Sequence, residues 1–80
     1  MEYQFTRHAL DVMTARSIKE VWVLQAIESF SKKVAQDESE VHFYRLIEEA
    51  GGRCLKVVIN PVKKRVVTVY FDRNMRKKGC

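Results

Sequence analysis

A hairpin pattern between residues 53 and 71 constrains the fold of this chain more than any other feature. Two runs rich in β-branched and aromatic residues, 53–59 and 65–71, flank the turn signal Asn60-Pro61. Because side chains alternate between the faces of a strand, one face of the hairpin is apolar and the other is mixed. The apolar face carries Leu55, Val57, Ile59, Val67, Val69 and Phe71. Such a face must be covered by the rest of the chain.

Two helices are predicted to provide this cover. Thr6 is suited to cap a helix that starts at Arg7 and has Arg16 at the end of its apolar face. The capping-box pattern Ser17-x-x-Glu20 predicts a second helix, from residue 18 to about residue 30. This second helix is apolar around most of its circumference, which predicts burial on more than one side. Trp22 belongs either to the core or to an exposed patch for a partner.

The remaining sequence predicts two more strands, at 32–36 and 41–48, and a turn at Gly51-Gly52. The predicted order is α-α-β-β-β-β with short connections, which gives an antiparallel meander. We therefore expect a single α+β domain over residues 1–80. Two N-terminal helices would pack on one face of a three- to four-stranded antiparallel sheet.

The charge distribution points to an acidic partner or to nucleic acid. The chain carries a formal net charge of +5, and its basic residues gather at 63–65 and 73–78. The segment 73–80 is expected to be a flexible basic tail. The alternative is solvated charge that only keeps a small domain soluble. The candidate RNA-binding residues are Tyr44, Lys63, Lys64, Arg65 and Arg73.

Several classes of protein are not expected. There is no apolar run long enough to span a membrane and no secretory signal pattern, so the prediction is a cytoplasmic protein without a membrane partner. Neither Cys54 nor Cys80 lies in a C-x-x-C pair, and zinc-ligand spacing is missing, so no structural metal or other cofactor is predicted. Cys54 is interpreted as a small strand residue, and Cys80 has no evident role.

The mixed face of the sheet predicts chemistry. If the apolar side chains face the helices, parity places five polar side chains together on the other face: His42, Tyr44, Lys56, Thr68 and Tyr70. Aromatic rings stack on unpaired bases and cations bind phosphates, so this surface suits RNA. For cleavage, His42 is the candidate titrating group, and Thr68 is a further catalytic candidate. Tyr70 or Tyr44 could donate or accept a proton, and Lys56 or Arg73 could hold the phosphate. The alternative is an ordinary mixed strand face without a function.

A resemblance supports the RNA hypothesis. The opening pattern His8-Ala9-x-x-x-Met13-x-x-Arg16-x-Ile18, with Trp22 and Ile27, and the strand 66–70 resemble a family of small bacterial proteins known as a domain of unknown function. That family is similar to the RelE and BrnT type toxins, bacterial mRNA interferases that pair with an antitoxin and cleave RNA without a metal. The resemblance implies a RelE-like fold and matches His8, Arg16, Thr68 and Tyr70 to family positions. His8 and Arg16 are alternatively packing residues at the helix corner.

Three hypotheses for function follow. The first is a cytoplasmic toxin that acts as a metal-independent ribonuclease and is neutralised by an antitoxin protein. The second is a non-catalytic module that binds RNA or an acidic protein through the same surface. The third is a homodimer formed through the Trp22 side or an edge strand.

Overall fold

A computed structural model describes residues 3–77 and 80 as an α+β domain built on a five-stranded mixed sheet. The strand order is β1-β5-β4-β3-β2, with β1 parallel to β5 and the other pairs antiparallel. The elements are β1 (Gln4–Phe5), α1 (Arg7–Arg16), α2 (Glu20–Glu28), β2 (Lys32–Asp37), β3 (Glu40–Ile47), the 3₁₀ turn η1 (Glu48–Ala50), β4 (Arg53–Asn60), β5 (Arg65–Phe71) and α3 (Arg73–Lys77).

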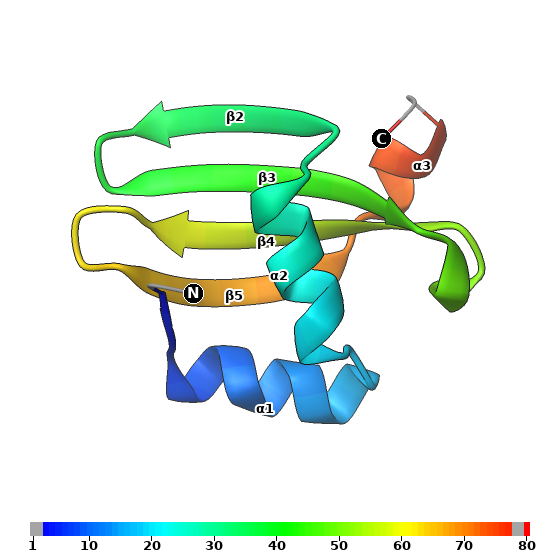
Figure 1. The fold of residues 1–80 in the computed structure, drawn as a ribbon, viewed down its shortest axis with the longest axis horizontal. Coiled ribbons are helices and arrows are strands. Elements are labelled where there is room, and N and C mark those ends of the chain that lie inside the picture. Colours follow the sequence, from blue (N-terminus) through cyan, green and yellow to red (C-terminus); the bar gives the residue numbers. More distant parts are fainter. Residues whose placement is uncertain (1–2, 78–79) are drawn as a thin grey trace.

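The two long helices occupy different positions on the sheet. Helix α2 crosses one face over β3 and β4, whereas α1 runs along the edge formed by β5 (Figure 1). The predicted cover by two helices is therefore mainly provided by α2. Helix α1 still contributes Ala9 and Met13 to the core. Among the described helices, none is long and apolar enough to cross a membrane.

The core lies between α2 and the sheet face that the sequence predicts to be apolar. Leu55, Val57 and Val69 are fully buried, and Trp22 is buried against Phe71 with 6.3 Å between the ring centroids. The core interpretation of Trp22 is thus confirmed. Its ring offers little surface to a second copy of the chain.

Three details of the predicted elements are wrong. The sheet has a fifth strand, β1, which is only two residues long and pairs with β5 in parallel. Ser17 does not open a capping box: it ends α1 in the left-handed conformation, and its N–H bonds the carbonyls of Met13 and Thr14. Helix α2 begins at Glu20, without a side-chain cap, and ends at Glu28.

A further error concerns β5. A register shift opposite Val58 and Ile59 places Val66 against Ile59 and Thr68 against Val58, so Val67 is the extra residue of a β-bulge. As a result Val66 is fully buried in the core, while Val67 is 38% exposed, the reverse of the predicted alternation. The bulge restores the predicted parity beyond it, with Thr68 outward and Val69 in the core.

The C-terminal segment has more structure than the predicted flexible tail. Arg73–Lys77 form α3, whose first turn is capped by the Asp72 carboxylate, which accepts from the N–H groups of Asn74 and Met75. Lys78 and Gly79 lie outside the described residues. Cys80 forms a disulfide with Cys54 on β4, so the interpretation of Cys54 as a mere small strand residue is wrong. This bond joins Cys80 to β4, the central strand of the sheet.

Thr6 links α1 to the bulge and gives a test of the fold. Its Oγ accepts from the N–H of Ala9, as the sequence predicts for a cap, and donates to the carbonyl of Val67 at 2.9 Å. Thr6→Ala is expected to lower the free energy of unfolding by about 1–2 kcal/mol, because it removes a cap and a tertiary hydrogen bond. Urea denaturation measures the loss. Thr14→Ala, an exposed change in the same helix, is the control, and equal effects of the two changes would contradict the capping role.

Candidate functional site

The register of the sheet places the predicted polar group on the face that α2 does not cover. One row across the strands reads Val34, His42, Val58 and Thr68, and the next reads Lys32, Tyr44, Lys56 and Tyr70. We call this side of the sheet the open face. All five residues that parity assigned to it lie in these two rows. The sequence alone does not show which of these residues share a row. The register places His42 and Tyr70 in different rows.

The second row is a ladder of alternating cations and phenol rings. Lys56 lies between two tyrosines, with its Nζ 5.8 Å from the ring centroid of Tyr44 and 5.2 Å from that of Tyr70. Lys32 reaches the Tyr44 ring from the other side, at 5.9 Å. Lys32 was not predicted as a site residue, because a single lysine in an edge strand carries no distinguishing signal.

The phenols keep Lys56 charged. Partial burial alone would lower the pKa of Lys56, but hydrogen bonding and attraction to Tyr70 and Tyr44 outweigh that effect and raise the pKa above its ordinary 10.5. The stabilisation of the ammonium by these partners is therefore complete at neutral pH and is lost only as the pH rises through the raised value. Lys56 serves as a cation at neutral pH and not as a general base.

An open groove lies between α1 and β5, next to this ladder. Its volume is about 520 Å³, and its lining residues are Asp11, Val12, Ala15, Arg16, Thr68, Val69 and Tyr70. Residues four apart lie on one side of a helix, so the side of α1 that carries Val12 and Arg16 also carries His8. Facing it, Thr68 and Tyr70 lie on the same side of β5.

His8 completes the groove through a direct contact. Its Nε2 lies 3.1 Å from the Oγ of Thr68, and the imidazole is exposed to solvent. The two residues are 60 positions apart in the chain, so only the packing of α1 against β5 brings them together. Three of the four residues that the resemblance matched to family positions, Arg16, Thr68 and Tyr70, therefore line the groove, and the fourth, His8, contacts Thr68.

His42 is on the open face as predicted but is held away from the groove. It is buried, and its Nε2 lies 2.6 Å from the Oε2 of Glu40 on the same strand. Val58 on β4 separates it from Thr68. Two strand spacings amount to roughly 10 Å, too far for both histidines to contact one substrate atom. A satisfied structural pair with Glu40 accounts for His42 better than catalysis does.

The predicted RNA-binding cations do not form one patch. Lys63 and Lys64 lie in the turn before β5, where the Asn60 side chain accepts from the N–H groups of Val62 and Lys63, and Arg65 is the first residue of β5. Arg73 follows the other end of β5, a strand of seven residues. The two ends of such a strand lie roughly 20 Å apart. Of these cations, none lines the groove.

The groove and its border combine cationic, hydroxyl and imidazole groups. Arg16 provides a guanidinium and Thr68 and Tyr70 provide hydroxyls in the groove, while His8 contacts Thr68 and the Lys56 ammonium lies beside Tyr70. Among the described residues, no cluster of three or more His, Cys, Asp and Glu side chains is arranged to hold a metal ion. Asp11 is the one acidic lining residue and pairs with Arg7 at 3.2 Å. The sequence reasoning missed Asp11, although it lies three positions after His8.

A family model described as "Domain of unknown function (DUF4258)" matches residues 5–71. The chain belongs to this family. The matched range contains both sides of the groove, whereas α3 and Cys80 lie beyond it. The predicted membership of a family of unknown function is confirmed, and the relation to RelE and BrnT type toxins stays a prediction. Comparison with curated proteins and with solved structures gave no match.

Proposed function

We propose that the protein cleaves single-stranded RNA in the groove between α1 and β5, by transfer of the phosphoryl group to the neighbouring 2′-hydroxyl. The observation that carries the proposal is that Arg16, Thr68 and Tyr70 line one open groove and that His8 contacts the Thr68 hydroxyl beside it. These residues come from both ends of the domain and combine an imidazole, a guanidinium and two hydroxyls. That set meets the needs of phosphoryl transfer.

The roles follow from the positions. His8, with one ring nitrogen at Thr68, uses the other to take the proton of the 2′-hydroxyl as its oxygen bonds to phosphorus. The bond from phosphorus to the 5′-oxygen breaks, and Tyr70 gives its phenolic proton to that oxygen. Lys56 donates to the Tyr70 oxygen, which leaves the phenolic proton free to face the substrate. The products are a 2′,3′-cyclic phosphate and a 5′-hydroxyl.

Two cations neutralise the charge that develops on the phosphoryl oxygens. Arg16 lies in the groove and offers a guanidinium fork, and Lys56 lies beside Tyr70 at the groove's border. Tyr70, which is 37% exposed, provides a ring face on which an unpaired base stacks. Single-stranded RNA fits this surface better than a duplex, whose bases are not available for stacking on protein side chains.

The biological role that we propose is that of a toxin neutralised by an antitoxin protein. This step rests on the resemblance to RelE and BrnT type toxins. Growth should stop when the chain is produced in a bacterium and resume when His8→Ala is introduced. Normal growth with the intact chain, together with no cleavage of RNA by the purified protein, would contradict both the toxin and the ribonuclease.

A second candidate is RNA binding without cleavage. The cation–phenol ladder favours it, because the ammonium groups of Lys32 and Lys56 and the exposed Tyr70 ring can hold a strand without a general base. The two candidates differ in one measurement. A labelled RNA that is retained by the protein but keeps its length over hours supports the binding module, whereas products ending in a cyclic phosphate support the ribonuclease.

Both candidates predict that Lys56 contacts phosphate. Lys56→Gln should reduce the slope of log affinity against log salt concentration by about 0.7, the contribution of one phosphate contact to a single strand. Lys33→Gln is the matched control, because it removes the same charge from the helix-covered face, where Lys33 lies 5.8 Å from the Phe43 ring. Fluorescence anisotropy with a labelled oligonucleotide measures both slopes. Equal salt slopes for Lys56→Gln and Lys33→Gln would mean that the RNA does not contact Lys56.

A further inference from the structure

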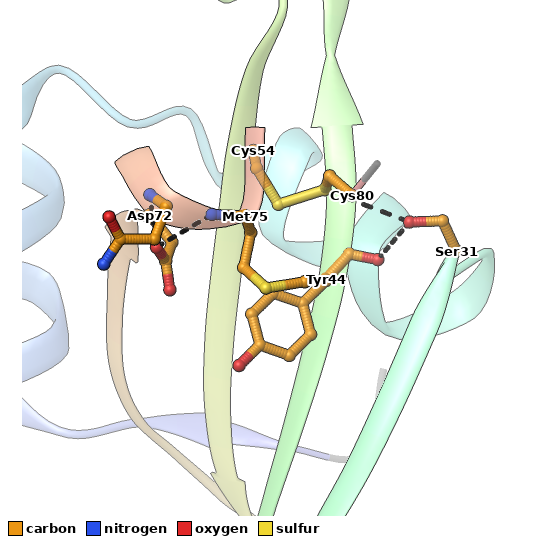
Figure 2. Close-up of a disulfide and its surroundings, with 7 residues drawn as sticks. Ser31, Tyr44, Cys54, Asp72, Met75 and Cys80 are labelled. Carbon is orange, nitrogen blue, oxygen red and sulfur yellow. Dashed lines mark hydrogen bonds between the residues drawn. A yellow bond between two sulfur atoms is a disulfide. The ribbon is translucent and has the colours of Figure 1, made fainter. Parts of the chain in front are cut away.

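The disulfide places a cover over one end of the ladder. In Figure 2 the Met75 side chain points toward the Tyr44 ring, beside the bond between Cys54 and Cys80. Tyr44 points to the open face, away from α2, yet it is only 7% exposed. Tyr70, in the same row, is 37% exposed. Tyr44 has a lysine on each side of its ring and α3 packed on the neighbouring strand β4, whereas Tyr70 lies on β5, away from α3.

Few contacts besides the disulfide hold this cover in place. Helix α3 has five residues, too few to be stable alone in water, and packs on β4. The Asp72 cap orders its first turn, and the N–H of Cys80 bonds the carbonyl of Met75. Cys80 also lies 4.0 Å from the Oγ of Ser31, which donates to the Tyr44 carbonyl (Figure 2). A backbone hydrogen bond from Asp72 to the carbonyl of Cys54, 2.8 Å long, fixes the start of this segment to β4, and the covalent bond fixes its end.

We propose that the Cys54–Cys80 disulfide is a redox latch: while it is closed, Met75 covers the Tyr44 ring, and its reduction uncovers Tyr44 as a stacking site for an RNA base. This inference rests on the proposed RNA-binding function and adds its regulation. The groove with His8 and Arg16 stays open in both states, since α3 does not line it. Reduction therefore extends the binding surface from Tyr70 to Tyr44 along the ladder.

The chemistry is thiol–disulfide exchange with a dithiol. One thiolate of the reductant attacks the Sγ of Cys80, which is half-buried, while Cys54 is 1% exposed. The Sγ–Sγ bond breaks and Cys54 takes the electron pair and a proton. The second thiolate of the reductant then attacks the mixed disulfide and releases Cys80 as a thiol. The protein gains two electrons and two protons, and the reductant becomes a cyclic disulfide.

Chemical modification of the phenols tests the latch directly. In the oxidised protein, N-acetylimidazole should acetylate Tyr70 and leave Tyr44 unmodified. Peptide mass spectrometry measures the acetylation of each tyrosine separately. After reduction with a phosphine, which leaves no thiol in solution, Tyr44 should react at a rate within a few-fold of that of Tyr70. Cys80→Ser should behave like the reduced protein without any reductant. Equal protection of Tyr44 in the oxidised and reduced proteins would overturn the latch.

A Met75 variant and a binding measurement test the latch further. Met75→Ala removes the covering side chain while the disulfide remains, so it should make Tyr44 reactive in the oxidised protein; continued protection would overturn the proposal even if the reduced protein unfolds. Binding of a labelled oligouridine should tighten about 5- to 140-fold on reduction, the range for stacking one base on one ring. Tyr44→Leu should abolish this redox dependence, and a redox effect that survives in Tyr44→Leu would count against the proposal.

The outcomes separate the latch from the proposed function. If reduction uncovers Tyr44 but RNA binds in neither state, the proposed function fails and the cover stands as a structural fact. If RNA binds with one affinity in both states although Tyr44 becomes reactive, RNA binding stands and the regulatory inference is wrong.

Discussion

His8→Ala is expected to slow the cleavage of single-stranded RNA by about 10²- to 10⁴-fold, the usual contribution of a positioned general base. The imidazole is exposed and makes its one described hydrogen bond to Thr68, so its removal should leave the free energy of unfolding nearly unchanged. Cleavage of a fluorescent RNA at saturating protein measures the loss. Thr14→Ala, in the same helix and facing solvent, is the control and should cleave like the unaltered protein.

The alternative base is the histidine that the sequence favoured. If His42→Gln abolished cleavage in a folded protein while His8→Ala left it intact, the active group would be His42 and the groove would lose its role. Thr68→Val provides a finer test of His8. Thr68→Val removes the oxygen that contacts the imidazole, so the pH at which cleavage is fastest should shift. If Thr68 had only a structural role, the cleavage rate would fall without such a shift.

The open face was predictable because strand parity needs no tertiary information. His42, Tyr44, Lys56, Thr68 and Tyr70 fall on one side of three neighbouring strands whenever the hairpins have their expected register. The bulge at Val67 was not predictable, since Val66 and Val67 are chemically identical. Its effect stays local because the alternation resumes at Thr68.

The groove could not be predicted, because it depends on where α1 docks. The stripe of His8, Val12 and Arg16 is visible in the sequence as a spacing of four. Nothing in that spacing says whether the stripe faces α2, the sheet or solvent. The choice is made by the parallel pairing of β1 with β5 and by the bond from Thr6 to Val67, both of which join distant parts of the chain.

The disulfide was missed for a related reason. Two cysteines 26 positions apart carry no framework pattern, and the basic residues before Cys80 favoured a flexible tail. The pairing becomes possible only when Asp72 caps α3 and turns the chain back over β4. The Asp72 cap therefore helps to bring Cys80 to Cys54. The spacing of the two cysteines in the sequence does not show this.

Leu55→Ala is expected to lower the free energy of unfolding by about 2–5 kcal/mol, the largest stability effect of any change considered for this chain. Leu55 is fully buried on β4, the strand that pairs with both β3 and β5. Its removal takes apolar surface from the core and leaves a cavity under α2. Domains of this size are marginally stable, with about 5–15 kcal/mol in total, so a large share of the variant should be unfolded at moderate urea concentration.

Leu46→Ala is the matched control for this change. It removes the same atoms from the neighbouring strand, opposite Cys54 on the open face, where Leu46 is 42% exposed. The expected effect is within about 0.5 kcal/mol, as for most exposed substitutions. Urea denaturation of both variants is measured with the disulfide intact, because reduction would also change the unfolded state. A loss of equal size in the two variants would mean that the sheet is covered on both faces, and that the open face is not the free surface on which RNA binding depends.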